Sequence, residues 1–416
     1  MFRFVHSADW QLGARFSQFG TAGARLREAR VETLNRTLGL AEEREADAFL
    51  VAGDLFEDNQ VDDALVLAVV ALFRAHPALP IYILPGNHDP STGPDSVWQR
   101  KAFLTGPPNV HVFREDGVTE LGGNVFLLAS PIRQKLSVTD PSQKLIGLAA
   151  GLPAESIKIG ITHGALAIEA KHQPNDFPIA LNAASRAGLD YLAVGHWHNW
   201  LADIDGGRIV MPGTPEPDRF GGDASGRVAL VELAGHGQLP NVQPVAVATL
   251  AWRSLAFDFI SQQASRAMVE AALAELAPCA SHTVLRLTLE GTASPADFAA
   301  VRSWLEPVLA GFLVGQIVNC TRIALSTVEL ADLQAGHPLL AQVLADIDRL
   351  ETLATGTMPT AQTTTPEAEV IVSSTLTLSE VQELLAPSRI ELARLTPEFF
   401  GQLRQMLLQA MQEVRQ

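Results

Sequence analysis

Residues 81–89, Ile-Tyr-Ile-Leu-Pro-Gly-Asn-His-Asp, join a short apolar run to a cluster of polar residues. The run Ile81–Leu84 has the length and composition of a buried strand. The polar cluster begins where that strand should end. In open α/β sheets, ligands collect beyond the carboxyl ends of the strands. The stretch therefore predicts a strand whose end contributes to a functional site.

The same pattern recurs along the first half of the chain. Apolar residues at helical spacing indicate helices between Arg25 and Glu45 and between Asp62 and His76. Strands that first alternate with helices and then follow one another closely predict an α/β layered sandwich. The other runs of strand length are Phe2–Val5, Ala48–Ala52, Val125–Ala129, Ile157–Ile161, Tyr191–Val194 and Arg208–Met211.

Polar residues follow five of the predicted strands, and glycine stands beside most of them. Because such strand ends meet at one edge of a sheet, we expect these residues to converge in one cleft. In chain order they are Asp9; Gly53 and Asp54; Gly86, Asn87, His88 and Asp89; Thr162, His163 and Gly164; and Gly195, His196, Trp197 and His198.

These strand ends supply the donors that hold hard or borderline divalent cations, namely carboxylate and amide oxygens and imidazole nitrogens. They are enough for a dinuclear centre in which Asp54 bridges two cations separated by roughly 3.5–4 Å. Such a pair can share a hydroxide as nucleophile and bind phosphate oxygens, so the pattern predicts phosphoryl transfer. The predicted ligands are Asp9, Asp54, Asn87, His163, His196 and His198.

His88 stands next to a predicted ligand but remains free to touch the scissile phosphate or to protonate the leaving oxygen. Taken singly, a Gly-Asp after a strand usually marks a turn, and a loop histidine is usually a surface residue. The combination of motifs in this order favours the metal site. Trp10 and Trp197 flank predicted ligands, and packing around the metals is a safer interpretation for them than stacking on a base.

The remainder of the chain contains no comparable cluster of metal ligands. Residues 251–328 are expected to form a small α+β domain, with helices at Ser265–Leu276 and Pro295–Leu309 and strands at Thr283–Leu289 and Gly315–Leu325. Residues 329–416 are expected to contain an amphipathic helix at Leu339–Leu353, a linker from Thr355 to Thr375 and a final helix from Thr396 to Val414. The predicted domains are therefore 1–250, 251–328 and 329–416.

Composition narrows the class of protein. The 416 residues are 47% hydrophobic and 18% charged, as in ordinary globular proteins. A formal net charge of −16 argues against coating nucleic acid by charge alone, so any DNA contact should be local. We find no secretory segment and no membrane-spanning run, and the two cysteines suit buried positions in a reducing compartment. We therefore expect a cytoplasmic protein without membrane contact.

The motifs carry a resemblance to a known family. Asp9-Trp-Gln-Leu-Gly, Gly53-Asp-Leu-Phe, Gly86-Asn-His-Asp, Thr162-His-Gly and Gly195-His-Trp-His resemble those of the calcineurin-like metallophosphoesterases. Within that superfamily, the opening Phe-Val-His-Ser-Ala-Asp-Trp-Gln-Leu-Gly from Phe4 and the loop Pro212-Gly-Thr-Pro-Glu are similar to the DNA-repair exonucleases of the SbcD type. The resemblance covers residues 1 to about 235.

The resemblance implies an αββα sandwich with a two-manganese site. One cation would take Asp9, Asp54 and His198, and the other Asp54, Asn87, His163 and His196, with His88 as the catalytic histidine. The family also implies double-strand exonuclease activity, a capping domain at residues 251–328, and a helical C-terminal segment that docks on the coiled coil of an SbcC-type ATPase. Packing of that segment on its own chain is an equal alternative.

One departure from the family pattern affects the site. The usual first motif is Asp-x-His, whereas Gln11 stands at the position of the histidine. A glutamine carbonyl is a weaker, neutral ligand, so Gln11 is expected to bind the first cation weakly or to leave the place to water. Glu57 and Asp58 both stand near enough in sequence to orient His88, and the spacing does not choose between them.

Three functions remain open on the sequence. The first is a metal-dependent DNA exonuclease that acts in double-strand break repair with an SbcC-type ATPase. The second is a phosphodiesterase for cyclic nucleotides or other small esters, which the acidic charge favours. The third is a non-catalytic scaffold in which Gln11 marks a weakened metal site. DNA-binding residues are not assigned, and the sequence leaves a homodimer open.

Overall fold

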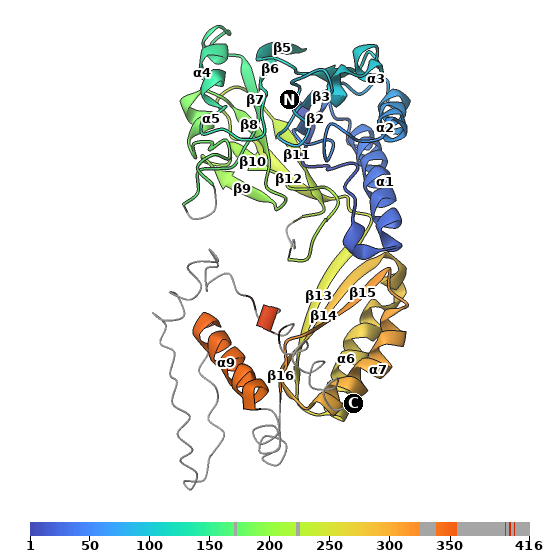
Figure 1. Ribbon diagram of the computed structural model, residues 1–416. Helices are drawn as coiled ribbons and strands as arrows, with labels where there is room; N and C mark the ends of the chain where they lie inside the picture. The colour runs from blue at the N-terminus through green and yellow to red at the C-terminus, as the bar shows by residue number, and fades with distance from the viewer. Residues whose placement is uncertain are drawn as a thin grey trace. The chain divides into compact units, whose positions relative to one another are not determined.

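The computed structural model describes residues 1–169, 173–221, 225–323 and 338–355, together with Thr396, Phe399, Phe400 and Leu403. The chain divides into two compact units, Met1–Trp252 and Arg253–Gln416 (Figure 1). Apart from these few positions, the predicted linker Thr355–Thr375 and the predicted terminal helix Thr396–Val414 lie outside the described residues.

The first unit contains two six-stranded sheets in its described part. In the first sheet, β1, β2, β3 and β4 run parallel, β11 pairs antiparallel with β1, and β12 pairs antiparallel with β11. Its strand order is β12 (Asn241–Ala246), β11 (Arg227–Leu233), β1 (Phe2–Ser7), β2 (Ala48–Ala52), β3 (Ile81–Leu84) and β4 (Val110–Val112).

The second sheet is also mainly parallel. Strands β6, β7, β8 and β10 run in one direction, and β5 and β9 pair antiparallel at the two edges. Its strand order is β5 (Gly117–Gly122), β6 (Val125–Ser130), β7 (Ile157–His163), β8 (Tyr191–Gly195), β10 (Ile209–Met211) and β9 (Leu201–Ile204).

Helices cover the outer face of each sheet (Figure 1). The first sheet is covered by α1 (Ala22–Glu43), α2 (Asp63–Ala75) and the short α3 (Lys101–Leu104). The second sheet is covered by α4 (Gln143–Ala150) and α5 (Ala183–Arg186). Short 3-10 turns lie at Ser17–Phe19 and Val97–Gln99. This arrangement confirms the αββα sandwich.

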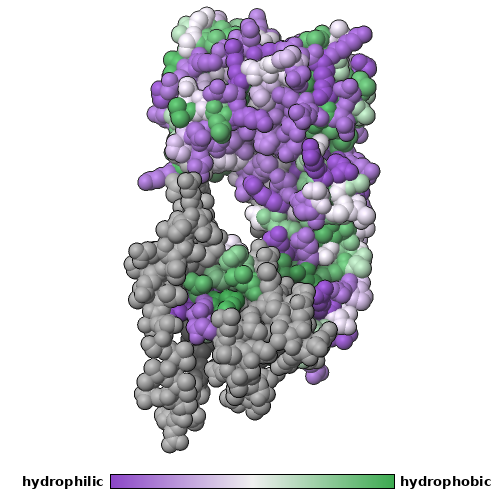
Figure 2. Space-filling view, viewed as in Figure 1, coloured by the Kyte–Doolittle hydropathy of each residue, from purple (hydrophilic) through white to green (hydrophobic). Residues whose placement is uncertain are grey.

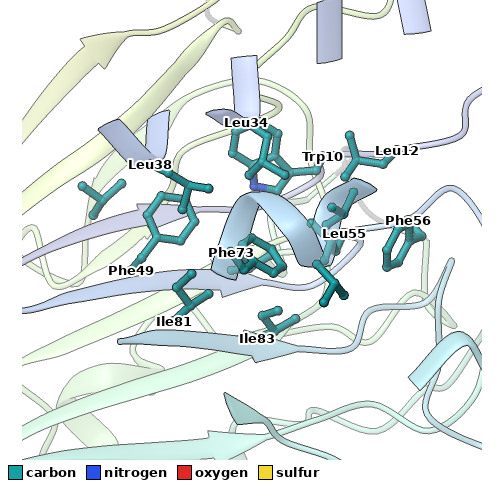
Figure 3. Close-up of a cluster of buried hydrophobic side chains, with 14 of the residues drawn as sticks. Trp10, Leu12, Leu34, Leu38, Phe49, Leu55, Phe56, Phe73, Ile81 and Ile83 are labelled. Atoms are coloured by element: carbon teal, nitrogen blue, oxygen red, sulfur yellow. The ribbon is translucent and has the colours of Figure 1, made fainter. Parts of the chain in front are cut away.

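The core consists of three apolar layers, and β2 shows how they arise. Alternate side chains of a strand point to opposite faces. Phe49 and Val51 therefore pack against α1 and α2, in the cluster shown in Figure 3, whereas Leu50 and Ala52 pack between the two sheets. Burying a side chain such as Phe49, which has no exposed surface, contributes about 1.5–3 kcal/mol.

The surface of the first unit is polar by comparison. Figure 2 shows mainly hydrophilic residues over its visible face, with hydrophobic ones in small groups. None of the helices in the described part of the chain is both long and apolar enough to cross a membrane. Of the two cysteines, Cys320 is buried as expected, but the expectation was wrong for Cys279, which is exposed in a 3-10 turn at Ala277–His282.

The second unit has the predicted α+β composition. Strands β13 (Ala251–Phe259), β14 (Thr283–Ala293) and β15 (Val314–Asn319) form a sheet, with β16 (Arg322–Ile323) paired to β14. Helices α6 and α7 bury Val269, Leu273, Val301 and Leu305 in one cluster with β14. The helices of this unit within the described residues include α6 (Gln262–Leu276), α7 (Pro295–Leu309) and α9 (Pro338–Thr355).

Several predicted boundaries in this unit were wrong, including the end of β14, which runs to Ala293 rather than Leu289. Helix α6 begins three residues early, at Gln262, because the Ser261 hydroxyl accepts a hydrogen bond from the Ala264 amide and caps it. The expected strand Gly315–Leu325 is interrupted after Asn319. The Asn319 side-chain oxygen accepts a bond of 3.0 Å from the Thr321 amide, which turns the chain before β16.

Candidate metal centre

The predicted site residues lie just beyond the ends of β1, β2, β3, β7 and β8. Asp9 and Asp54 follow β1 and β2, and Asn87 follows β3, all in the first sheet. His163 is the last residue of β7 and His196 follows β8, both in the second sheet. Because the strands of each sheet are parallel, their carboxyl ends meet at one edge, where the two sets of side chains come together.

The loops hold these residues in an uncommon backbone conformation. Asp9, Gln11 and Asp54 have φ angles of 54°, 46° and 54°, in the left-handed region that side chains other than glycine rarely adopt. Backbone bonds fix the first loop to the second, from the Asp9 amide to Gly53 O at 3.1 Å and from the Gln11 amide to Asp54 O at 3.1 Å. Strain of this kind collects at functional sites, where the surrounding structure maintains it.

Three glycines allow the loops to approach one another closely. A Cβ at Gly53 would lie 2.0 Å from His163 Nδ1, and one at Gly86 would lie 2.1 Å from Asp54 Oδ1. A Cβ at Gly195 would lie 2.1 Å from the backbone oxygen of Ala52. Each glycine beside a predicted ligand is therefore needed for space, because any other side chain would displace the site.

Four donor atoms have the mutual spacing expected around one cation. Asn87 Oδ1 lies 2.9 Å from His163 Nε2 and 3.1 Å from His196 Nδ1, and His163 Nε2 lies 3.4 Å from Asp54 Oδ2. Ligands at roughly 2.0–2.2 Å from a metal are about 3 Å from one another. His163 Nδ1 lies 2.8 Å from the Ala52 carbonyl, which can only accept, so Nε2 is the nitrogen turned to this group.

A second group of donors shares Asp54 and His163 with the first. Asp9, Asp54 and His163 offer ligand atoms that all lie within 4.8 Å of one another. Asp9 Oδ1 and Gln11 Oε1 are buried and have no hydrogen-bond partner among the described residues. Such atoms are costly unless a ligand satisfies them, so the residues present fit a cation here as well. Gln11 Nε2 donates to Asp54 Oδ2 at 3.1 Å.

Burial and mutual charge interactions shift the pKa values of the buried acidic and histidine side chains at this site. Burial raises the pKa of Asp9, although the nearby His163 and His198 oppose this. Burial alone would raise the pKa of Asp54, but His163 beside it lowers the pKa below its usual range. Burial likewise opposes charging of His163, yet Asp54 raises its pKa to about 9. Asp54 and His163 therefore stabilise each other's charged forms.

The backbone of His88 is bonded to the proposed ligand Asp54, whereas its imidazole ring is bonded to Glu57 outside the ligand set. Its backbone amide donates to Asp54 Oδ1 at 2.9 Å, and its Nδ1 lies 2.9 Å from the backbone oxygen of Glu57. That carbonyl, rather than the carboxylate of Glu57 or Asp58, faces the ring, which answers a question that the spacing left open. Because a carbonyl only accepts, Nδ1 carries a proton and Nε2 is left for a substrate.

Three further acidic residues lie near the site, and the sequence reasoning missed two of them, Asp176 and Asp218. Asp89 is fully buried, accepts bonds from the Gly86 and Phe56 amides at 2.7 and 3.0 Å, and burial raises its pKa to about 7. Asp176 Oδ2 lies 2.8 Å from His196 Nε2, and Asp218 Oδ2 lies 2.6 Å from His198 Nδ1. Asp89 belongs to the quoted Gly-Asn-His-Asp string, but Asp176 and Asp218 stand in loops without a motif.

Comparison with known proteins agrees with this geometry. Residues 2–200 match a family model described as calcineurin-like phosphoesterase. An uncharacterized metallophosphoesterase of Bacillus subtilis, YhaO, is 23% identical over 83% of this chain and 87% of its own length. A subunit of nuclease SbcCD from Rhodobacter capsulatus is 35% identical over 21% of this chain and 22% of its own length. DNA double-strand break repair protein Mre11 of Methanopyrus kandleri is 26% identical over 52% and 49%.

Solved structures show a more distant likeness. A Thermus thermophilus protein aligns with a TM-score of 0.39 and 12% identity, over 59% of this chain and 99% of its own. A dimetal phosphatase from Danio rerio aligns with a TM-score of 0.37 and 12% identity, over 59% of this chain and 98% of its own.

Proposed function

We propose that the chain is a metal-dependent phosphoester hydrolase, and more specifically a DNA exonuclease that uses two divalent cations, because residues 2–200 match the family model described as calcineurin-like phosphoesterase. The observation that carries the proposal is the convergence of oxygen and nitrogen donors from both sheets around Asp54, at mutual distances of 2.9–3.4 Å. We propose Mn²⁺ as the cation and Asp54 as the residue that bridges the pair.

The proposed ligands divide as the resemblance implies. Asp54, Asn87, His163 and His196 would hold one cation, and Asp54, Asp9 and His198 the other. The buried, unpaired Oε1 of Gln11 makes this residue a weak additional ligand of the second group. When bound, such a cation pair lowers the pKa of water and stabilises the charge that develops on phosphate.

Hydrolysis adds water across a P–O bond. A new P–O bond forms as the bond to the leaving oxygen breaks, and that oxygen takes up a proton. We assign His88 to this step, as contact to the phosphate or as proton donor to the leaving oxygen. Its Nδ1 is held by the Glu57 carbonyl at 2.9 Å, so Nε2 is kept in one orientation.

The names of two relatives support DNA as the substrate. One belongs to a nuclease and the other is a double-strand break repair protein. The same names support a role in DNA repair and an SbcC-type ATPase as partner. That residues 251–328 act as a capping domain and that the C-terminal segment docks on the partner we propose from the sequence resemblance alone. With a net charge of −16, contact with DNA would be local to the site.

A second candidate is a phosphodiesterase for cyclic nucleotides or similar small esters. The net charge of −16 favours this candidate. With 46 acidic residues against 30 basic ones, the chain as a whole repels a long polyanion such as DNA more than it repels a small ester. The two candidates share the metal centre and differ in the size of the substrate.

One assay separates them. Purified chain with Mn²⁺ would be given end-labelled duplex DNA and a cyclic nucleotide in parallel, with His88→Ala and the exposed-histidine control His282→Ala. We expect DNA degradation that His88→Ala reduces by about 100-fold or more and His282→Ala leaves unchanged. Turnover of the cyclic nucleotide without any DNA cleavage would establish the second candidate instead. Equilibrium dialysis should find two Mn²⁺ per chain.

A further inference from the structure

A cavity opens beside the two histidines that follow β8. It has a volume of about 510 Å³, within the roughly 300–1,000 Å³ range of small-molecule sites. Its walls include His196 and His198, which are predicted ligands of different cations, so the cavity borders the proposed metal centre. Arg219 contributes positive charge to the lining of the same cavity, and Trp197 and Trp200 contribute aromatic surface.

The two indoles of the cavity differ from the tryptophans of the core. Trp10 and Trp98 are fully buried, and their ring nitrogens donate to Ser7 Oγ and to the backbone oxygen of Asp89. Packing is therefore the correct interpretation for Trp10. Trp197 and Trp200 are half-buried, and each rests against a different core cluster while lining the cavity. Their rings are held in place and still present surface to a ligand.

Arg219 adds a cation to this aromatic surface. Its side chain is 60% exposed, and its Nε lies 3.9 Å from Asp218 Oδ1, too far for a strong hydrogen bond. The guanidinium therefore remains available to a phosphate, which it can bind in a bidentate manner. The Arg219 guanidinium thus places a positive charge at this cavity, although the chain as a whole has a net charge of −16.

We propose that this cavity is a subsite for the nucleobase next to the scissile phosphate, with Trp197 as the main stacking surface and Trp200 beside it. Arg219 would bind the neighbouring phosphate of the strand. Every base has a π-face, so stacking would hold a terminal nucleotide with little preference among sequences. The proposal rests on the proposed function in one respect, namely that a phosphate lies at the metal centre.

Binding of nucleotides tests the subsite without catalysis. We would titrate the Mn²⁺-loaded full chain with dAMP and with deoxyribose 5-phosphate, which lacks the base, and follow the heat of binding. Trp197→Ala should weaken dAMP about tenfold or more and leave deoxyribose 5-phosphate unchanged, while Trp197→Phe should retain most of the affinity. Trp304→Ala is the matched control, because Trp304 is a partly buried indole of the other unit. Equal weakening of both ligands, or none, would overturn the proposal.

DNA substrates separate this proposal from the exonuclease proposal. One duplex ends in a normal nucleotide and a matched duplex ends in a tetrahydrofuran residue without a base. Trp197→Ala should slow cleavage of the first about tenfold and leave the second unchanged. Arg219→Gln should weaken a dinucleotide more than dAMP. If the chain cuts neither duplex but keeps its Trp197-dependent preference for dAMP, the exonuclease proposal fails and the base subsite stands. Slowing of both duplexes to the same extent would remove the subsite.

Discussion

At the scale of single residues, two carboxylates decide which nitrogen of His196 and of His198 is left free of their bonds. Asp218 bonds to Nδ1 of His198 and leaves Nε2, whereas Asp176 bonds to Nε2 of His196 and leaves Nδ1 toward Asn87. A carboxylate behind a metal-binding histidine fixes its tautomer and increases its basicity. We therefore interpret both aspartates as positioning residues for the proposed ligands.

Asp218→Asn should weaken Mn²⁺ binding by about 10–100-fold, because an amide cannot support His198 as a carboxylate does. Calorimetric titration of the chelator-treated chain with Mn²⁺ gives the affinity directly. Asp258→Asn removes an exposed carboxylate of the other unit and serves as the control. An Asp218→Asn protein with unchanged affinity would show that His198 needs no such support.

His6 gives the first unit a dependence of stability on pH. Burial lowers the pKa of His6 to about 3, whereas an unfolded chain titrates near 6.5. The unfolded state thus binds the proton first, so this contribution is complete above pH 6.5 and is lost as the pH falls towards 3. Between pH 7.5 and 5.5 it should decrease by about 1.4 kcal/mol.

The measurement is urea unfolding at the two pH values for the wild type, His6→Gln and the control His282→Gln. His6→Gln should be less stable at both values, because Tyr191 loses its partner, yet it should lack this part of the pH dependence. An identical change in unfolding free energy for wild type and His6→Gln would contradict the assignment.

At the scale of elements, the most buried strands were the easiest to predict. The expected bounds of Ala48–Ala52 and Ile81–Leu84 agree with β2 and β3, because strands buried on both faces read as continuous apolar runs. Strands at the sheet edges were not seen. β5 alternates between half-buried and exposed residues, and β12 contains Pro244 among exposed positions, so neither forms an apolar run.

The convergence of the site residues was predictable for a related reason. Residues that follow parallel strands lie at the same edge of the sheet, beyond the carboxyl ends of the strands. Asp54, Asn87 and His163 were recognisable because each adjoins a glycine at a strand end. Asp176 and Asp218 reach the histidines from long loops, and no local pattern determines where such loops fold. Whether the gathered residues bind metal stays a prediction.

Gly86, which follows β3, offers a test of whether the close approach of its loop to Asp54 is needed for activity. In Gly86→Ala the new Cβ would meet Asp54 Oδ1 at 2.1 Å and the Asp54 amide at 2.5 Å, so the loop must shift. A shift near 1 Å at the proposed bridging ligand should lower activity by about 100-fold while circular dichroism shows a folded chain. Gly39→Ala in α1, where no atom lies within 4 Å, should be neutral or stabilise by about 0.5–1 kcal/mol. Equal activity of both variants would mean that the loop yields easily.

At the scale of the whole molecule, the proposed metal centre would add a link between two sheets that already meet through apolar packing and through polar bonds such as His6–Tyr191 at 2.8 Å and His163–Ala52 at 2.8 Å. A cation that binds only the folded chain stabilises it by about 2.7 kcal/mol at a concentration 100 times its dissociation constant. For a unit of this size, that corresponds to a rise of roughly 5–10 °C in the unfolding midpoint. Chelator should lower the midpoint and Mn²⁺ should restore it, as followed by scanning calorimetry.

Two single-residue variants test whether the proposed ligands hold the stabilising cation. His163→Ala removes a proposed ligand from β7 and should abolish the response to Mn²⁺, whereas His282→Ala should keep it. A midpoint that rises with Mn²⁺ in His163→Ala as well would place the stabilising cation elsewhere on the chain.

The distribution of the proposed ligands over the chain has a consequence for biosynthesis. Asp9, Asp54 and Asn87 leave the ribosome early, but His196 and His198 follow only after β8, once most of the first unit has been made. A nascent chain that stops short of them lacks part of each ligand set. Hydrolytic activity should thus appear late, in chains that have already paired their second sheet, so unfinished polypeptides would leave phosphodiesters in the cell intact.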